Sequence, residues 1–169
     1  MSEVRFERLE LRAAVEDFFA HEASLLDTWQ LDEWLSLWDD PCRYEVAPTA
    51  IDDPLAASAD TTLFLIADDR YRLEQRIIRI KKSSAHVEYP HSKTRHLYAN
   101  IRLVTVTDEQ IEASLGFVTC RTKRAITTSY IGRADYKLKR TAAGFLIMSK
   151  RIGLDLDSLV PQGKVSIFL

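Results

Sequence analysis

Cysteine and glycine are scarce in this chain, and their scarcity excludes several kinds of functional site. Only two cysteines, Cys42 and Cys120, occur among 169 residues, too few for a disulfide framework or a four-cysteine cluster. The five glycines are isolated from one another, so no glycine-rich loop can cradle a phosphate group. The sequence also lacks a Gly-x-Ser-x-Gly elbow, which would expose a nucleophilic serine. These absences exclude phosphate-loop and serine-hydrolase chemistry.

Long apolar runs and an excess of one charge are missing as well. No apolar run approaches the roughly 20 residues of a membrane span, and the first ten residues lack the features of a signal peptide. With 23 Lys and Arg against 25 Asp and Glu, neither nucleic acid nor an anionic membrane is expected as a partner. We therefore expect one cytoplasmic domain, residues 1–169, with reduced thiols.

Helices are expected in the first half of the chain. In residues 7–29 apolar side chains recur at steps of three and four, and Leu31–Trp38 repeats this pattern. Residues 42–46 alternate as a short strand, whereas residues 47–61 carry two prolines and no periodicity, which indicates a long loop. Residues 62–67 fit a strand or the start of a helix. Asp68 or Asp69 can then cap a helix that runs to about Lys82.

Strands dominate the second half. In the strand expected at residues 95–107, one parity contains Leu97, Ala99, Ile101 and Leu103, and the other contains His96, Tyr98, Asn100 and Arg102. Such alternation predicts that the apolar set faces the core and the polar set faces outward. Further strands are expected at 111–117, 125–140 and 145–154. The fold class is α+β, with helices packed on one face of a strongly bent, mainly antiparallel sheet.

Metal ligands are the first chemistry to consider. His86, His91 and His96 recur every five residues, but this spacing places neighbours on opposite sides of a strand, so structural roles are favoured over a metal site. A Rieske centre needs Cys-x-His and Cys-x-x-His pairs, and neither cysteine is followed by histidine. Trp29, Trp34 and Trp38, at helical spacing, are more typical of a core than of a ligand pocket.

Three stretches together resemble the small (β) subunits of bacterial aromatic-ring-hydroxylating dioxygenases. The first is residues 18–48, with His-Glu-Ala and Leu-Leu-Asp followed by a helix containing Trp-Leu. The second follows a pattern Glu-x-Pro-x-Ser-x-Thr-Arg-His and then Asn-x-Arg, which is matched by Glu88, Pro90, Ser92, Thr94, Arg95, His96, Asn100 and Arg102. The third is the ending, Gly163 to Leu169. The resemblance spans essentially the whole chain, apart from the loop at 47–61.

The resemblance implies a cone-shaped fold of the NTF2-like and cystatin-like group. It also implies a mainly structural subunit with no catalytic, metal or cofactor-binding residue on this chain. The Rieske [2Fe–2S] cluster and a mononuclear Fe(II) would belong to a large (α) subunit in an α3β3 assembly. A reductase, with or without a ferredoxin, would supply electrons from NADH. The reaction would add O2 to an aromatic ring and give a cis-dihydrodiol, and the sequence does not name the ring.

A permanent complex of this kind needs a sizeable contact surface with aromatic and arginine anchors. We expect it on the polar face of the strand at 95–107, the turn before this strand and the C-terminal end. The predicted contact residues are Tyr89, Pro90, His91, Arg95, His96, Tyr98, Asn100, Arg102, Ile167, Phe168 and Leu169. The competing interpretation is that Arg95 and Asn100 satisfy their own sheet edge.

Two other functions remain open at this point. One is a stand-alone isomerase or dehydratase of the same fold, in which Asp39 or Asp40, Tyr44 and His96 would supply an acid and a base inside the cone. Such an enzyme would be active without a partner. The other is a binding module that uses the tryptophans to line a pocket. The resemblance favours the dioxygenase subunit over both.

Overall fold

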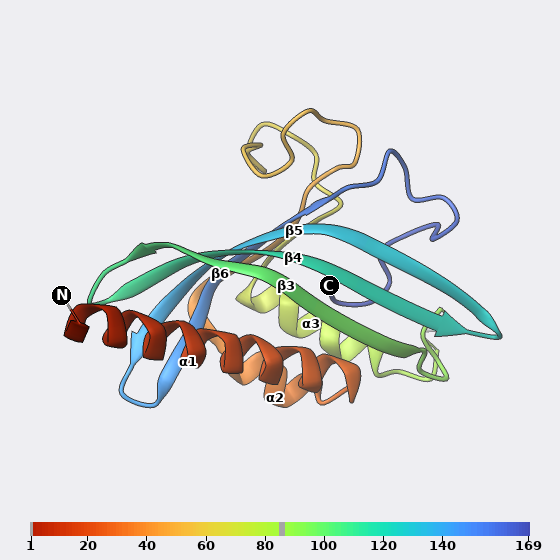
Figure 1. Cartoon of the computed structure of the whole chain (residues 1–169). Helices are drawn as coiled ribbons and strands as arrows, with labels where there is room; N and C mark the ends of the chain where they lie inside the picture. Colours follow the sequence, from red (N-terminus) through yellow and green to blue (C-terminus); the bar gives the residue numbers. More distant parts are fainter. Residues whose placement is uncertain (1, 85–86) are drawn as a thin grey trace.

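A curled sheet wraps around three helices in the computed structural model, which describes residues 2–84 and 87–169 (Figure 1). The elements in chain order are α1 (Ser2–Asp27), α2 (Leu31–Ser36), β1 (Trp38–Val46), β2 (Ile66–Asp69), α3 (Arg70–Ile80), β3 (Lys93–Val106), β4 (Gln110–Lys123), β5 (Ile126–Thr141) and β6 (Gly144–Leu154). In the described residues, no helix is long and apolar enough to cross a membrane.

The sheet is mixed but mainly antiparallel. Its six strands lie in the order β2-β1-β6-β5-β4-β3. Every neighbouring pair is antiparallel except β1 and β6, which run parallel. This arrangement confirms the predicted α+β class and the helices on one face of a bent sheet. The last four strands, β3 to β6, follow one another as a meander, as the sequence predicted, and β3 forms one of the two edges of the sheet, with β2 at the other.

The boundaries in the middle of the chain follow local chemistry. Residues 66–69 form a strand, so of the two predictions for residues 62–67 the strand is the better one. The Asp69 side chain accepts a hydrogen bond from the backbone N–H of Arg72 at 2.9 Å, so Asp69 is the predicted cap of α3. Leu73, Ile77 and Ile80 form the buried stripe of that helix.

The predicted faces of β3 are wrong in the first half of the strand and right in the second half. His96 is 6% exposed, whereas Leu97 is 54% exposed, the reverse of the expectation. The reason is a bulge between Ala99 and Arg102, where Asn100 adopts a positive φ of 54°. A bulge inserts one residue and reverses the parity of the side chains beyond it. Ile101 therefore faces inward, as predicted.

The C-terminal segment, residues 155–169, contains neither helix nor strand. It leaves β6, turns back and ends on the helix side of the sheet, beside α3 (Figure 1). Its last three side chains, Ile167, Phe168 and Leu169, are at most 4% exposed. The apolar end of the chain is thus part of the core of this chain.

The loop between β1 and β2 crosses the outer face of the sheet, above the strands in Figure 1. Arg151 of β6 donates hydrogen bonds to the backbone oxygens of Leu55 at 3.2 Å and Ala57 at 2.9 Å, and it pairs with Glu45 at 2.7 Å. The loop is therefore held to the outer face by the guanidinium of one arginine, whose planar fork suits several acceptors at once.

Two glycines on neighbouring strands provide a matched test of this packing. A Cβ atom on Gly132 would lie 2.1 Å from the backbone oxygen of Gly153, whereas on Gly116 the nearest atom would be 3.8 Å away. Because backbone atoms must move to accept the first substitution, Gly132→Ala should lower the free energy of unfolding by about 1–3 kcal/mol. Gly116→Ala should change it by less than about 0.5 kcal/mol. Denaturant titration measures both, and equal effects would contradict the close approach.

Candidate functional site

The inward side of β3 places His96 between α1 and the C-terminal segment. Its Nδ1 lies 2.6 Å from a carboxylate oxygen of Asp27, and its Nε2 lies 3.0 Å from the backbone oxygen of Phe168. The His96 ring therefore bridges the Asp27 carboxyl group and the backbone of Phe168, one ring nitrogen facing each. Asp27 also accepts the backbone N–H of His96 at 3.1 Å, which fixes the end of α1 on the edge strand.

Aromatic rings surround the end of the C-terminal segment. The Phe168 ring lies 4.6 Å from the Trp34 ring and 5.9 Å from the Tyr44 ring, measured between centroids. The backbone N–H of Leu169 donates to the Tyr44 hydroxyl at 3.1 Å. Burial raises the pKa of Tyr44 far above its ordinary value, which keeps this hydroxyl protonated. The C-terminal segment thus fills the interior between the curled sheet and the helices, which we call the cone. Its side chains pack there, and its backbone forms hydrogen bonds with polar groups of that interior.

A second buried cluster lies deeper in the cone, around Glu22 of α1 and Lys150 of β6. The Lys150 ammonium lies 3.0 Å from Glu22 Oε1 and 3.2 Å from the Tyr98 hydroxyl. Glu22 also accepts from Trp34 Nε1 at 3.2 Å and from the Tyr136 hydroxyl at 2.9 Å. Glu22 and Lys150 are 0% and 1% exposed. Such a pair is tolerable in a core only when further hydrogen bonds satisfy both ions, as they do here.

Burial dominates the electrostatics of this cluster. Desolvation lowers the pKa of Lys150, and the adjacent Glu22 carboxylate opposes that shift. Desolvation, reinforced by the negative charge of Glu22, raises the pKa of Tyr98 and of Tyr136 well above the ordinary value for tyrosine. Both phenols therefore stay neutral: the Tyr136 hydroxyl donates to Glu22, and the Tyr98 hydroxyl accepts from Lys150.

The acid and base groups around His96 border two spaces of very different size. A groove of about 650 Å³ between α1 and β3 is lined by Asp27, His96 and Tyr98, and a small cavity is enclosed on the side of the C-terminal segment. The cavity beside His96 and Phe168 measures about 10 Å³, close to the minimum for a single water molecule. The residues predicted for the rival enzyme are not brought together either. His96 takes its carboxylate from Asp27, whereas Asp39 pairs with Lys139 at 3.1 Å and Asp40 is exposed. The prediction that Asp39 or Asp40 partners His96 is wrong.

The histidines and cysteines that the structure describes are not grouped as metal ligands. Within residues 2–84 and 87–169, no three His, Cys, Asp or Glu side chains lie together in a ligating group. Burial raises the pKa of the Cys42 thiol to about 11, which opposes the thiolate that metals bind. His91 stacks on Trp29 with 4.1 Å between ring centroids. His86, the third histidine of the predicted series, lies outside the described residues.

The residues predicted to contact a partner fall into two groups. Those on the surface are Tyr89, Pro90, His91, Arg95, Asn100 and Arg102. Those inside the chain are His96, Tyr98, Ile167, Phe168 and Leu169, of which Tyr98 is half-buried and the others are buried. The bulge in β3 accounts for the division within that strand, because it turns His96 and Tyr98 toward the cone.

The outer face of β3, β4 and β5 carries an apolar row across the strands. Leu97 pairs in register with Val118, and Val118 pairs with Ile131. Leu97 and Ile131 are 54% and 44% exposed, and Val118 is half-buried. Arg95, Arg102 and Arg133, all exposed, lie on the strands around this row. We call these six residues the outer row.

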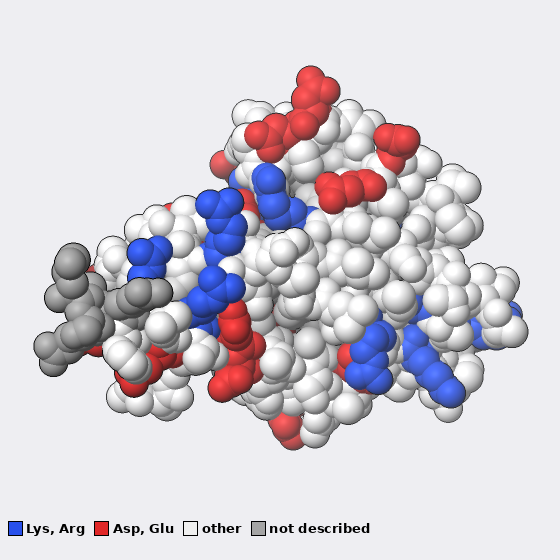
Figure 2. All heavy atoms as spheres, in the orientation of Figure 1, with Lys and Arg blue, Asp and Glu red and all other residues white. Residues whose placement is uncertain are grey.

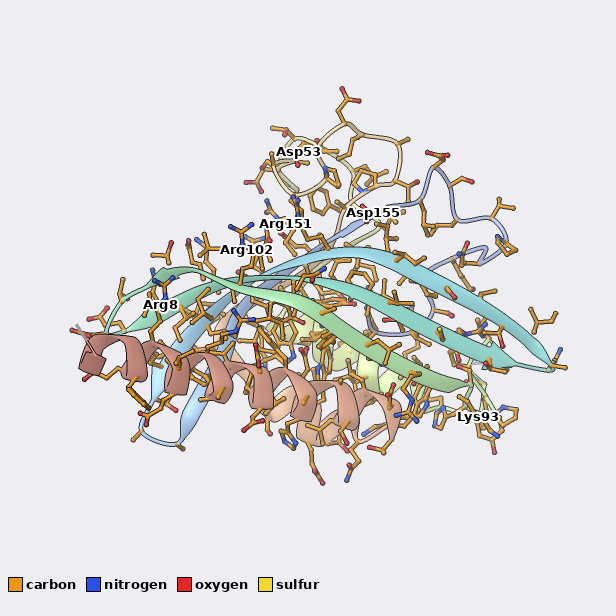
Figure 3. All side chains as sticks on the ribbon, viewed as in Figure 1. Arg8, Asp53, Lys93, Arg102, Arg151 and Asp155 are labelled. Carbon is orange, nitrogen blue, oxygen red and sulfur yellow. The ribbon has the colours of Figure 1, made fainter. Side chains whose placement is uncertain are left out.

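The figures show the surroundings of β3 to β5. Figure 2 shows a broad area without charged side chains, with basic and acidic side chains around it. Figure 3 shows Arg102 on the outer side of the sheet, the side that also carries Arg151 and the loop residue Asp53. The outer face of the sheet is therefore exposed over β3 to β5, whereas the loop between β1 and β2 covers it near β6.

Sequence reasoning did not single out the buried charges, although a signal for each existed. Glu22 lies three residues after Phe19 and three before Leu25, within the apolar stripe of α1. Lys150 shares the strand parity of Ile152 and Leu154, both buried. A charged residue in each of two apolar patterns, of opposite sign, predicts a buried ion pair.

Comparison with known proteins identifies the family. The model for the family described as "Ring hydroxylating beta subunit" matches residues 21–160. The small oxygenase component of the p-cumate 2,3-dioxygenase system of Pseudomonas putida is 48% identical over 94% of this chain and 87% of its own length. This chain belongs to the ring-hydroxylating β-subunit family. The resemblance read from the sequence is thereby confirmed.

Solved structures support the fold of this β subunit. A chain in a structure of naphthalene 1,2-dioxygenase with indole in the active site superposes with a TM-score of 0.81, covering 95% of this chain and 86% of that one, at 14% identity. An NTF2-like protein with a cystatin-like fold from Novosphingobium aromaticivorans superposes with a TM-score of 0.64, covering 95% and 92%, at 16% identity. The predicted NTF2-like, cystatin-like fold is confirmed.

The buried ion pair of the β subunit leads to a stability prediction. Lys150→Met should lower the free energy of unfolding by about 3–5 kcal/mol, because it leaves the Glu22 carboxylate buried without its cation. The matched control is Lys139→Met, which removes a half-exposed partner of Asp39 and should cost about 0–1 kcal/mol. Adding Glu22→Gln to Lys150→Met should recover part of the loss. Equal effects of the two single lysine substitutions in denaturant titration would refute this role.

Proposed function

We propose that this chain is the structural small subunit of an oxygenase that adds both atoms of O2 to an aromatic ring and forms a cis-dihydrodiol. The observation that carries the proposal is the 48% identity, over 94% of the chain, to the small oxygenase component of a p-cumate dioxygenase system. While the C-terminal segment occupies the cone, the cavity enclosed beside His96 and Phe168 measures about 10 Å³, smaller than any aromatic substrate, which supports a non-catalytic role for this interior.

The metal centres of such an oxygenase lie on its large subunit in this proposal. The Rieske [2Fe–2S] cluster needs two cysteines and two histidines in fixed spacing, and this chain lacks that pattern. The large subunit also carries the mononuclear Fe(II), and three copies of each subunit form an α3β3 assembly in the cytoplasm. A reductase, with or without a ferredoxin, delivers electrons from NADH.

The substrate proposed for the complete oxygenase is a benzene ring that carries a carboxylate. The relative at 48% identity belongs to a system named for p-cumate, an aromatic acid. The pocket that selects the ring lies on the large subunit, so this chain contributes by holding that subunit in its working assembly. Its own residues therefore act in the proposed reaction by positioning the partner.

The outer row is the surface proposed to meet the large subunit. It joins an apolar centre, Leu97, Val118 and Ile131, to a margin of arginines, the composition that stable interfaces favour. The turn formed by Tyr89, Pro90 and His91, together with Asn100, extends this surface. From inside the chain, His96, Tyr98, Ile167, Phe168 and Leu169 support the strands that carry it.

Co-production tests the function directly. This chain and the large subunit, supplied together with a reductase, should convert p-cumate to a cis-dihydrodiol, and either chain alone should give no diol. Product is measured by mass spectrometry, with benzoate and naphthalene as comparison substrates. Full activity of the large subunit without this chain would contradict a structural requirement for it.

A charge placed in the outer row tests the interface. Leu97→Asp should reduce co-purification with the large subunit by roughly tenfold or more, because a buried unpaired carboxylate is costly at an interface. The matched control is Ile78→Asp on α3, where the side chain is also partly exposed, at 43%. Both variants should keep the thermal midpoint of the free chain. Equal recovery of the large subunit with the two variants would rule out this surface.

A further inference from the structure

The cone is closed by a segment of the chain that has no helix or strand of its own. Between Lys164 and Leu169 its polar anchors to the rest of the chain include Lys164 O to the Tyr130 hydroxyl, Ser166 Oγ to Glu88, Phe168 O to His96, and Leu169 N to Tyr44. Residues without a regular hydrogen-bonding ladder open more easily than a sheet or helix. The segment is therefore held in the cone by these four hydrogen bonds and by the burial of its last three side chains, without a strand ladder.

Two buried polar groups in the described residues around the cone lack hydrogen-bond partners, and one of them, Thr94, lies beside the segment. The Thr94 hydroxyl and Trp38 Nε1 are buried, and neither has a hydrogen-bond partner in the described structure. Thr94 is 9% and Trp38 3% exposed. Thr94 lines the small cavity together with His96, Ile167 and Phe168. A buried hydroxyl without a hydrogen-bond partner destabilises the folded state. The segment therefore packs well against the apolar side chains of the cone but leaves a polar group there without a hydrogen bond.

A surface groove lies directly outside the segment. It has a volume of about 550 Å³, and Ile167 and Phe168 form part of its wall. The same two residues line the small internal cavity. The segment is therefore the partition between solvent and the aromatic interior, and its outward displacement would open the cone into the groove. Arg79 of α3 and Lys164 give the groove a basic margin.

We propose that the cone is a binding site for a small aromatic molecule with a carbonyl group, and that residues 166–169 occupy it in the closed state. The ring takes the place of the Phe168 side chain between Trp34 and Tyr44. The carbonyl takes the place of Phe168 O and accepts from His96 Nε2. This site is distinct from the outer row, and it does not depend on the proposed oxygenase function.

An aromatic amide meets these requirements most completely. Its carbonyl accepts the hydrogen from His96, and its N–H donates to the Thr94 hydroxyl that the segment leaves unpaired. Toluene offers the ring alone and fills only the apolar part. Benzamide is therefore the probe, and toluene is its control for ring burial without hydrogen bonding. An apolar cavity of about 150 Å³ is enough to take up benzene in another protein.

The experiment compares the full-length chain with Phe168→Ala, in which the ring site is vacated. Benzamide should raise the thermal midpoint of Phe168→Ala in a dose-dependent manner, because a ligand that binds only the folded state stabilises it. Its dissociation constant by calorimetry should be roughly tenfold or more lower than for the unsubstituted chain, where the segment competes. If Phe168→Ala does not fold, Phe168→Leu replaces it in the same measurements, because leucine keeps more of the packing.

Thr94→Val separates the polar part of the site from its packing. In the otherwise unsubstituted chain it should leave the thermal midpoint unchanged or raised, since the hydroxyl has no partner to lose. In the Phe168→Ala background it should weaken benzamide binding and leave toluene binding unchanged. Equal losses for both probes would overturn the assigned hydrogen bond.

Two outcomes would overturn the site as a whole. One is a folded Phe168 variant that binds neither probe, which would make the cone a sealed core. The other is equal binding of benzamide to the unsubstituted chain and to Phe168→Ala, with unchanged hydrogen exchange at residues 166–169, which would place the probe elsewhere. Faster exchange of those amides when benzamide binds the unsubstituted chain would support displacement of the segment.

Discussion

The contacts of His96 join three parts of the chain that are far apart in sequence. Its ring binds Asp27 at the end of α1 on one side and the backbone of Phe168 on the other, while its own backbone belongs to β3. The edge strand, the long helix and the C-terminal segment are thus joined by the ring of one histidine. The burial of Phe168 against Trp34 and Tyr44 depends on this arrangement, and so does the closure of the cone.

The orientation of His96 depends in turn on the bulge at Asn100. Without an inserted residue, the alternation that brings Ile101 and Leu103 inward would bring Leu97 inward and turn His96 to solvent. Because of the bulge, the side chains of β3 that face the cone are polar in the first half of the strand and apolar in the second half. It also leaves Leu97 and Arg95 on the outer face, where the outer row offers a surface to a partner.

The periodicity of apolar residues predicted the helices and strands well. It predicted which side chains of a strand are buried only where the strand is regular. The helices, the meander and the cap at Asp69 follow from local patterns. The inversion of Leu97 does not, because a non-glycine residue in a bulge leaves no clear mark on alternation. The Asp27 partner of His96 lies 69 positions away in the chain, and only the tertiary fold reveals that pairing. The resemblance to β subunits supplied the function, which no motif for chemistry on this chain could indicate.

Central to the proposed function is that this chain is a metal-free subunit whose outer face meets an iron-bearing partner. Native mass spectrometry of the chain produced together with the large subunit, combined with iron and sulfide analysis, tests it most directly. The account predicts one complex with equal numbers of both chains, three of each, and iron that stays with the large subunit after dissociation. A lone dimer or monomer of this chain, or iron retained by it, would contradict the account.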